Sequence, residues 1–187
     1  MNREIILMRH GQPNLTMLGK VSLFEMKHWI EHYNLSEITR QPAPQASMQL
    51  AATARVIVSS SAPRALSSVR ALCLQPTVVD PVFCEAQLPH GRWRLPKLSG
   101  FTWAFILRIS WLCGFSVTVE SARQARLRAG KAARQLQDLS SAGPVLLLGH
   151  GFMNRMIGKQ LEVNGWTRQI RNGNRYWSAV VYQMNQQ

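Results

Sequence analysis

Two short apolar runs, far apart in the chain, each end in a histidine that a glycine follows. Residues 5–8 lead into Arg9 and His10, and residues 145–148 lead to His150. A brief, continuously apolar run that stops at glycine is typical of a strand buried on both faces of a parallel sheet. Both histidines are therefore expected just beyond the carboxyl ends of buried strands, and this repetition restricts the chain to folds that bury two such strands.

Strands alternate with helices along the rest of the chain. The same patterns predict further strands at 55–59, 77–79 and 176–184, and helices at 22–33, 47–53, 63–74, 121–139 and from 151 to about 161. This order predicts an α/β fold, a three-layer α/β/α sandwich with a mostly parallel central sheet that 176–184 closes as an antiparallel edge strand. With 187 residues, 46% of them hydrophobic, the chain suits one domain over residues 1–187.

Residues 121–139 show the clearest helical pattern. Small apolar residues and leucines recur at helical spacing and form one stripe, which predicts a buried face. The basic residues that fall largely outside the stripe are Arg123, Arg126, Lys131 and Arg134. We expect an amphipathic helix with a basic outer face.

Polar residues follow three of the predicted strands. Arg9 with His10, the segment from Ser60 to Arg64, and His150 each stand at a strand end. The carboxyl ends of parallel strands meet at one edge of a sheet, where α/β proteins bind ligands. We therefore expect these residues to converge on one site.

The residues at these positions resemble the motifs of the histidine phosphatase superfamily, which has the phosphoglycerate mutase-like fold. The matching elements keep the family's order and span nearly the whole chain: Arg9-His10-Gly11, Ser59-Ser60 with Arg64-Ala65, Glu85, Glu120-Ser121 and Gly149-His150-Gly151. Two positions depart from the family's pattern. Ser61 stands where the family usually has proline, and Phe152 stands where many members have a small polar residue.

The resemblance implies a catalytic site of five residues. His10 would attack phosphorus as a neutral imidazole and become a phosphohistidine. Arg9, Arg64 and His150 would bind the phosphate oxygens. Glu85 would protonate the leaving alcohol and later deprotonate the water that hydrolyses the phosphoenzyme. No metal or cofactor is required in this scheme, because the protein's own cations neutralise the phosphate.

The activity that the resemblance implies is that of a phosphoric monoester hydrolase, a metal-independent phosphatase. The segment after Glu85 lacks the polar pattern of the glycolytic mutases, and Gln87 or His90 could share the local polar role. One alternative is a protein phosphohistidine phosphatase, against which the long segment between Glu85 and His150 argues. The other is a non-catalytic anion-binding module that docks on membrane or nucleic acid through its basic face.

Residues 84–119 form a cap-like apolar excursion, irregular at 84–98, where prolines and a glycine fall. It holds three tryptophans, and Arg108 lies near the middle of its most apolar part, 101–119, which falls short of a membrane-spanning helix. An aromatic cap would suit a phosphate ester with an apolar leaving group, or a site at a membrane surface. The interpretation favoured here is that 101–115 forms buried helices that cover the sheet.

The chain carries a large excess of positive charge. Lys and Arg total 22 against 9 Asp and Glu, a formal net charge of +13, and only Asp138 and Glu162 are acidic in residues 121–187. This excess suits a phosphorylated small molecule or a lipid-like phosphate, and leaves open a peripheral contact with an anionic membrane. Nucleic-acid binding is not expected, because no RNA- or DNA-binding signature accompanies the charge. The sequence does not indicate the oligomeric state.

The three cysteines, Cys73, Cys84 and Cys113, are widely spaced and form no C-x-x-C motif. This spacing supports neither a disulfide framework nor a zinc site. No secretory signal is visible at the start of the sequence. We therefore expect a reducing compartment and a cytoplasmic protein.

Overall fold

The computed structural model describes residues 3–15, 19–92, 94, 96–116, 119–171, 173 and 175–184. The strands in this part of the chain are β1 (Arg3–Arg9), β2 (Lys20–Val21), β3 (Val56–Ser59), β4 (Val78–Val79), β5 (Leu98–Ser99), β6 (Val145–Gly149), β7 (Thr167–Arg171) and β8 (Ala179–Met184). The α-helices are α1 (Met26–Leu35), α2 (Gln45–Ala51), α3 (Pro63–Ala71), α4 (Gly100–Leu112), α5 (Ala122–Leu139) and α6 (Gly151–Val163). Two 3₁₀ turns, η1 (Pro81–Phe83) and η2 (Ser140–Ala142), complete the order.

The main sheet has the strand order β4-β3-β6-β1-β8-β7. Its first four strands run parallel, and β8 then pairs antiparallel with β1. The two strands that carry the histidines, β1 and β6, are direct neighbours, with Arg9 opposite Gly149. The predicted mostly parallel sheet is confirmed, and the pairing explains why the two His-Gly segments lie together.

The prediction that the last strand forms the edge of the sheet is wrong. Strand β8 lies between β1 and β7, and β7 is the edge strand, paired antiparallel with β8. The sequence of β7 is Thr-Arg-Gln-Ile-Arg, which lacks a strong apolar pattern. An edge strand has one neighbour and commonly carries charged side chains, so hydrophobic periodicity does not reveal it.

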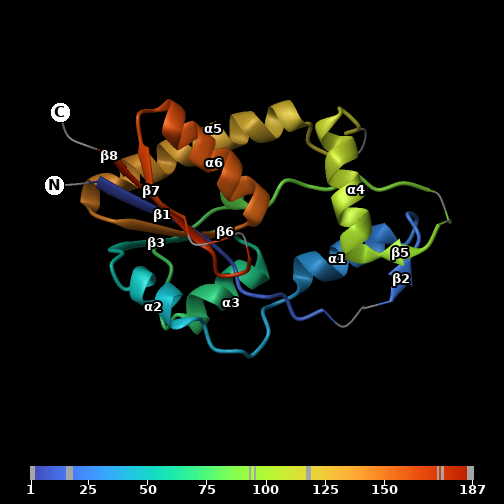
Figure 1. Cartoon of the computed structure of the whole chain (residues 1–187), viewed down its shortest axis with the longest axis horizontal. Coiled ribbons are helices and arrows are strands. Elements are labelled where there is room, and N and C mark those ends of the chain that lie inside the picture. Colours follow the sequence, from blue (N-terminus) through green and yellow to red (C-terminus); the bar gives the residue numbers. More distant parts are fainter. Residues whose placement is uncertain are drawn as a thin grey trace.

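Helices cover both faces of the sheet and form the predicted three layers (Figure 1). Helices α5 and α6 pack on one face, where alternate strand residues such as Ile5, Leu7 and Leu147 join the core. Helices α2 and α3 lie on the other face, against the intervening residues such as Ile6 and Leu148. Because successive strand side chains point to opposite faces, the continuous apolar runs supply both layers of core.

Helix α5 has the place that its pattern predicts. Its stripe of small residues is fully buried against the sheet and α6: Ala125, Ala129, Ala132, Ala133 and Leu136. Arg123, Arg126, Lys131 and Arg134 are exposed on the opposite side. Ser121 begins the helix in a capping box with Gln124, which satisfies two amides at the N-terminus.

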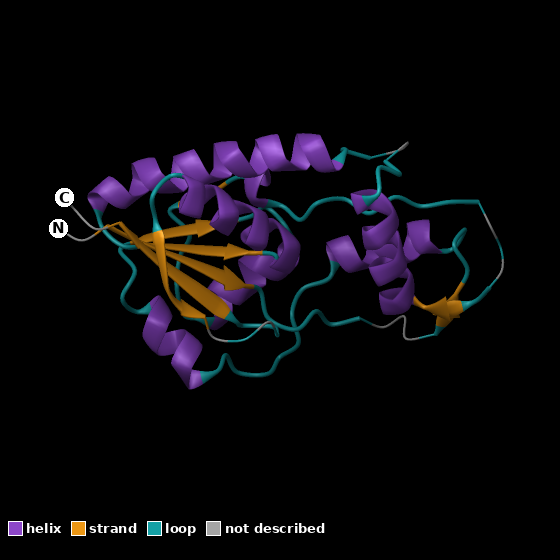
Figure 2. Ribbon diagram, turned by 45° about the horizontal axis from the view of Figure 1, so that its top comes forward, coloured by secondary structure: helices purple, strands orange, loops and turns teal. Residues whose placement is uncertain are grey.

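Helix α4 lies beyond the end of the sheet instead of covering it (Figure 2). It packs on α1, and Val21, Met26, Trp29, Trp103 and Leu107 form a small core of their own. We call the unit of α1, α4, β2 and β5 the cap; β2 and β5 pair with each other in a separate two-stranded sheet. The expectation that 101–115 covers the sheet is therefore wrong for α4.

Two contacts place the cap helices. A side chain at Gly100 would collide with Trp29, so glycine lets the start of α4 approach α1 closely. At the other end, Trp111 alone in α4 joins the buried core under the sheet. No helix in the described ranges is long and apolar enough to cross a membrane.

Candidate active site

The residues expected at the strand ends are brought together. His10 follows β1 and His150 follows β6, and their ring centroids are 5.1 Å apart. Ser60 follows β3 and its hydroxyl lies 2.8 Å from Nε2 of His150. Arg64 stands in the first turn of α3, where Pro63 occupies a position that needs no amide donor. The predicted convergence at one edge of the sheet is confirmed.

His10 has a defined tautomer. Its Nδ1 lies 2.7 Å from the carbonyl oxygen of Gly11. A carbonyl oxygen can only accept, so Nδ1 carries the hydrogen and, in the neutral ring, Nε2 keeps its lone pair. Burial, followed by the charge of Arg64, lowers the pKa of His10 to about 3. The imidazole is therefore neutral at ordinary pH, as a nucleophile requires.

Two arginines flank this ring, and each lies over a tyrosine. Arg64 is buried, its guanidinium carbon is 4.5 Å from the centre of the Tyr33 ring, and its Nη1 donates to the Tyr33 carbonyl at 3.1 Å. The guanidinium of Arg9 lies 4.4 Å from the ring of Tyr176, which is 5.7 Å from the His10 ring. Each tyrosine ring thus packs against a planar guanidinium, a support that the sequence did not reveal.

His150 is fully buried beside His10. Burial, then the positive charge of Arg64, lowers the pKa of His150 well below its usual range. Within the described residues its Nδ1 is buried without a hydrogen-bond partner, and so is Nε of Arg64. A ligand bound next to these two atoms would be able to supply the missing hydrogen bonds.

The loop after β1 is fixed from α3. Ser68 accepts a hydrogen bond from the amide of Gly11 at 2.9 Å and donates to the carbonyl of Arg64 at 2.6 Å. One hydroxyl thus connects the His10 loop to the turn that carries Arg64. Sequence reasoning missed Ser68, because a serine inside a helical segment gives no signal of its partner.

Glu85 lies at the N-terminus of α6. Its Oε2 accepts from the amide of Phe152 at 3.0 Å, and its Oε1 accepts from the amide of Met153 at 2.8 Å. These amides have no partner inside the helix, and the helix dipole attracts a negative group there. Glu85 therefore ties the excursion to the helix that follows His150, an arrangement that the sequence did not predict.

Arg128 holds the segment that precedes Glu85. It donates to the carbonyls of Val82 at 2.9 Å and Cys84 at 2.7 Å, and it pairs through both ends of its fork with Glu120. A signal was present in the sequence. Arg128 lies on the same helix face as Ala125 and Ala132, so it is an arginine on the buried stripe.

A cavity of about 730 Å³ opens between this edge of the sheet and the cap. We call it the cleft. The sheet side contributes Arg9, Arg64, Glu85 and Tyr176. The cap side contributes an aromatic wall in which Trp29 stacks on Tyr33, at 5.4 Å, and Phe101 meets Trp29 edge-on, at 5.2 Å. The cationic end thus adjoins the aromatic wall, because Tyr33 packs against Arg64 as well as Trp29, and the space beside them would hold a drug-sized ligand.

Other cleft residues include those that the sequence left without a definite role. Gln87 and His90 line the cleft, as does Phe152. Arg108 turns inward from α4, donates to the carbonyl of Ala86 at 2.6 Å, and lies 4.7 Å from the ring of Phe152. The Ala86 carbonyl is therefore a hydrogen-bond partner of Arg108, and burial lowers the pKa of the Arg108 guanidinium.

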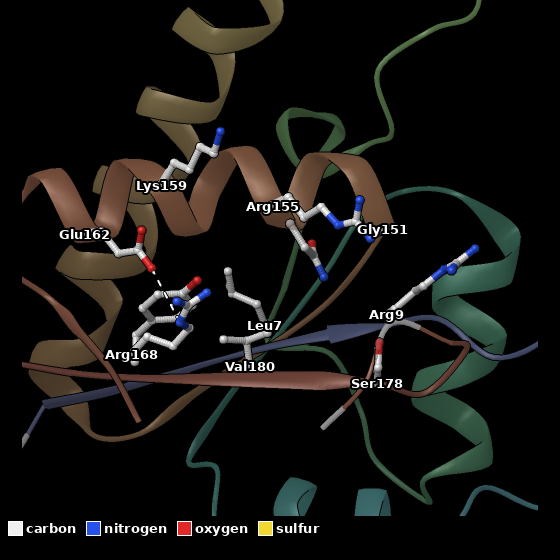
Figure 3. A pocket seen from close by; sticks show the side chains of 12 residues that line it. Leu7, Arg9, Gly151, Arg155, Lys159, Glu162, Arg168, Ser178 and Val180 are labelled. Atoms are coloured by element: carbon white, nitrogen blue, oxygen red, sulfur yellow. Dashed lines mark ion pairs between the residues drawn. The ribbon is translucent and has the colours of Figure 1, made fainter. Parts of the chain in front are cut away.

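A second cavity, of about 240 Å³, lies beside α6 (Figure 3). Leu7 and Val180 line it, and Arg155, Lys159 and Arg168 are also among its residues. Arg168 pairs with Glu162 at 3.7 Å, and Figure 3 shows Lys159 pointing away from Leu7 and Val180. These cations do not converge as those of the cleft do.

Comparison with known protein families decides the relationship. The model of the histidine phosphatase superfamily (branch 1) matches residues 5–187, which is nearly the whole chain. The chain belongs to the histidine phosphatase superfamily. In this structure His10 follows β1, Arg64 lies in the first turn of α3 and His150 follows β6.

Solved structures show the same fold at low sequence identity. Mycobacterial hydrolase 1 is 17% identical, with a TM-score of 0.61 over 98% of this chain and 91% of that one. A mycobacterial glucosyl-3-phosphoglycerate phosphatase is 17% identical, with a TM-score of 0.52 over 86% and 80%. A phosphoserine phosphatase from Entamoeba histolytica is 22% identical, with a TM-score of 0.53 over the same shares. No curated protein sequence matches the chain.

Proposed function

We propose that the protein is a metal-independent phosphatase that hydrolyses a phosphomonoester through a phosphohistidine on His10. The observation that carries the proposal is the state of His10: a buried, neutral imidazole whose Nδ1–H donates to Gly11 and whose Nε2 keeps its lone pair beside Arg64. Membership of the superfamily, and the named activities of two structural neighbours, support phosphatase chemistry.

In the first step, Nε2 of His10 attacks phosphorus and forms an N–P bond as the P–O bond to the leaving alcohol breaks. Arg9 and Arg64 each offer a planar fork that can bind two phosphate oxygens. The Nδ1–H of His10 stays bonded to Gly11, so the ring is oriented and its developing positive charge is stabilised. These cations take the place that a metal ion fills in other phosphatases.

His150 would donate to the same oxygens. When the Ser60 hydroxyl donates to Nε2, the ring's hydrogen is on Nδ1, the buried atom that lacks a partner. A phosphate oxygen would satisfy it. In this proposal Ser60 sets the tautomer of His150 as Gly11 sets that of His10.

Glu85 is proposed as the proton carrier. In the second step its carboxylate takes a proton from the water that attacks the phosphohistidine, a role that the position of Glu85 in the cleft supports. In the first step the leaving oxygen needs a proton, which Glu85 would donate. Glu85 would first have to be protonated on one of its two oxygens, and in this structure both oxygens accept hydrogen bonds from amides of α6. The two steps can be separated by varying the leaving group.

The cleft also favours a class of substrate. A phosphate at Arg9 and Arg64 leaves its alcohol portion against the aromatic wall of Trp29, Tyr33 and Phe101. Burial of apolar surface against such a wall stabilises an apolar or aromatic group by about 25 cal/mol per Å². We propose a monoester with an apolar leaving group rather than a densely hydroxylated one.

The test is release of phosphate from an aryl phosphate in the presence of a chelator, by the wild-type protein and by His10→Ala. The proposal expects activity that the substitution abolishes, together with a gain of one phosphoryl group on the wild-type chain in a rapid quench. Activity that survives in His10→Ala would overturn the mechanism. A folded wild-type protein that binds phosphate but hydrolyses no monoester would favour the anion-binding module.

A further inference from the structure

The outer face of α4 is apolar and largely exposed, and among its large side chains Phe101 contacts the ring of Trp29. Large apolar side chains on this face and just past its end are exposed: Phe101, Phe105, Ile106, Ile109, Leu112 and Phe115. Phe105 is 68% exposed and Phe115 is 67% exposed. Phe101, Phe105, Ile109 and Leu112 lie three or four residues apart and therefore share one side of the helix, while Ile106 is exposed within the helix and Phe115 just past its end. Monomeric proteins rarely expose patches of this kind unless they bind something.

The exposed face of α4 carries no charge. The charged residue of this helix, Arg108, is held inward by the carbonyls of Ala86 and Gln87 and by the ring of Phe152. The opposite face of the helix is occupied by its packing in the cap, where Trp103 and Leu107 are buried. The helix thus has two apolar faces, and only one of them is covered by protein.

Exposed cations flank the patch. Arg92, Arg94 and Lys97 are exposed in the segment that leads into α4, and Lys20 pairs in β2 with Ser99, which caps the helix. Beyond the other end of α4, Arg123 and Arg126 are exposed in the first turns of α5. Between Glu85 and Glu120 the sequence contains no acidic residue. Two acidic residues belong to the α1 part of the cap: Glu25, immediately before α1, and Glu31, within it.

We propose that the outer face of α4 docks on an anionic lipid bilayer. Phenylalanine, isoleucine and leucine side chains would enter the boundary between headgroups and acyl chains, and the flanking lysines and arginines would meet lipid phosphates. The charge pattern favours a bilayer over a second copy of the chain. A twofold contact through this face would bring like charges together in a protein of net charge +13.

The patch is continuous with the mouth of the cleft. Phe101 and Phe105 belong to the exposed face and also line the cleft. A bilayer against α4 would therefore lie next to the entrance that leads to Arg9 and Arg64. If the proposed phosphatase activity holds, the docked protein could take a phosphorylated amphiphile whose apolar part rests in the lipid; the docking itself does not depend on His10.

The experiment measures binding of the purified full chain to vesicles by co-sedimentation. Vesicles of phosphatidylcholine mixed with phosphatidylglycerol are compared with vesicles of phosphatidylcholine alone, at low and high salt. The test variant is the triple substitution Ile109→Ser, Leu112→Ser and Phe115→Ser, none of which lines the cleft. Wild-type binding to the anionic vesicles is expected to fall with salt, and the triple variant should partition about tenfold or more weakly.

A matched control removes exposed apolar side chains elsewhere. Val79→Ser, Leu127→Ser and Val163→Ser remove groups that are 46%, 63% and 78% exposed on β4, α5 and the end of α6. This control and His10→Ala should bind vesicles as the wild type does. Both triple variants should hydrolyse an aryl phosphate in solution at the wild-type rate, so that loss of docking and loss of catalysis are distinguished.

Three results would overturn the proposal: no wild-type binding to the anionic vesicles, unchanged binding by the α4 variant, or equal weakening in the matched control. Light scattering supplies a further outcome. A wild-type dimer that the α4 substitutions convert to a monomer would show that a second copy covers this face, and would also overturn the proposal.

Discussion

The two sides of the cleft are built in different ways. On the sheet side, Arg9 and Arg64 line the cleft, and His10 and His150 lie buried next to each other at the strand ends without lining it. On the cap side, Phe101 and Phe105 come from a helix whose outer face is exposed. The sheet side supplies buried cations of the kind that phosphoryl transfer needs, whereas the cap supplies mainly apolar area, and its inward cation, Arg108, donates to the carbonyls of Ala86 and Gln87. The difference implies that substitutions on the sheet side impair the chemical step, while those on the cap side alter the choice of substrate.

The largest effect is expected from His10→Ala. Without the nucleophile the N–P bond cannot form, so kcat should fall by about 10⁴-fold or more for every phosphomonoester. Steady-state release of phosphate from an aryl phosphate provides the measurement. A fall of less than tenfold would mean that the chemistry does not reside on the sheet side.

Arg64→Lys should cost about 10²–10³-fold in kcat/KM. Lysine keeps the charge but loses the planar fork, and it cannot lie over Tyr33 as a guanidinium does. The matched control is Arg134→Lys on the exposed face of α5, which should leave kcat/KM unchanged. Equal, small effects in the two variants would show that Arg64 supports the cap and does not bind phosphate.

Glu85→Gln should have an effect that depends on the leaving group. We expect about a 10²-fold loss of kcat/KM, which reports only the steps up to release of the alcohol, with an alkyl phosphate, whose alkoxide needs a proton, and a much smaller loss with an activated aryl phosphate. The comparison is made on one preparation with both esters. An equal loss with the two esters would indicate that Glu85 acts by fixing α6 through Phe152 and Met153 rather than by proton transfer.

The buried histidines should make stability depend on pH. The pKa of His10 falls from 6.5 to about 3 on folding, so between these values the unfolded chain binds more protons, and stability is lost as pH falls. His150 shifts in the same direction. Between about pH 6 and about pH 3 the shift of His10 should lower the free energy of unfolding by about 1 kcal/mol per pH unit. Denaturation at several pH values should show a shallower slope in His10→Ala, and an unchanged slope would contradict the prediction.

The smallest effect is expected on the cap side. Phe105→Ser should raise KM about fivefold for an ester with a large apolar group and leave kcat for a small phosphomonoester unchanged. Ile109→Ser on the same helix, outside the cleft, serves as the control. A fall in kcat for small and large esters alike would break the division between a chemical side and a specificity side.

The part of the site that lies at strand ends could be predicted from the sequence. The runs before His10 and His150 are apolar enough to be recognised as buried strands, and the carboxyl ends of such strands in a parallel sheet meet at one edge. The support around them could not be predicted. Tyr33 and Tyr176 lie under the arginines, and Ser68 joins Gly11 to Arg64, through contacts between residues that are distant in the chain.

Helices α4 and α5 show how far the position of a helix in the fold can be predicted from its sequence. By itself the sequence determined where α5 lies, because its apolar residues form one stripe and its charges lie largely on the other side. Large apolar residues lie on both the buried and the exposed sides of helix α4, so periodicity does not say which side the protein covers. The tertiary structure decided that α4 packs on α1, that β7 forms the edge of the sheet, and that Glu85 binds the start of α6. Local patterns fix local structure, whereas these arrangements depend on which distant segments compete for the same surface.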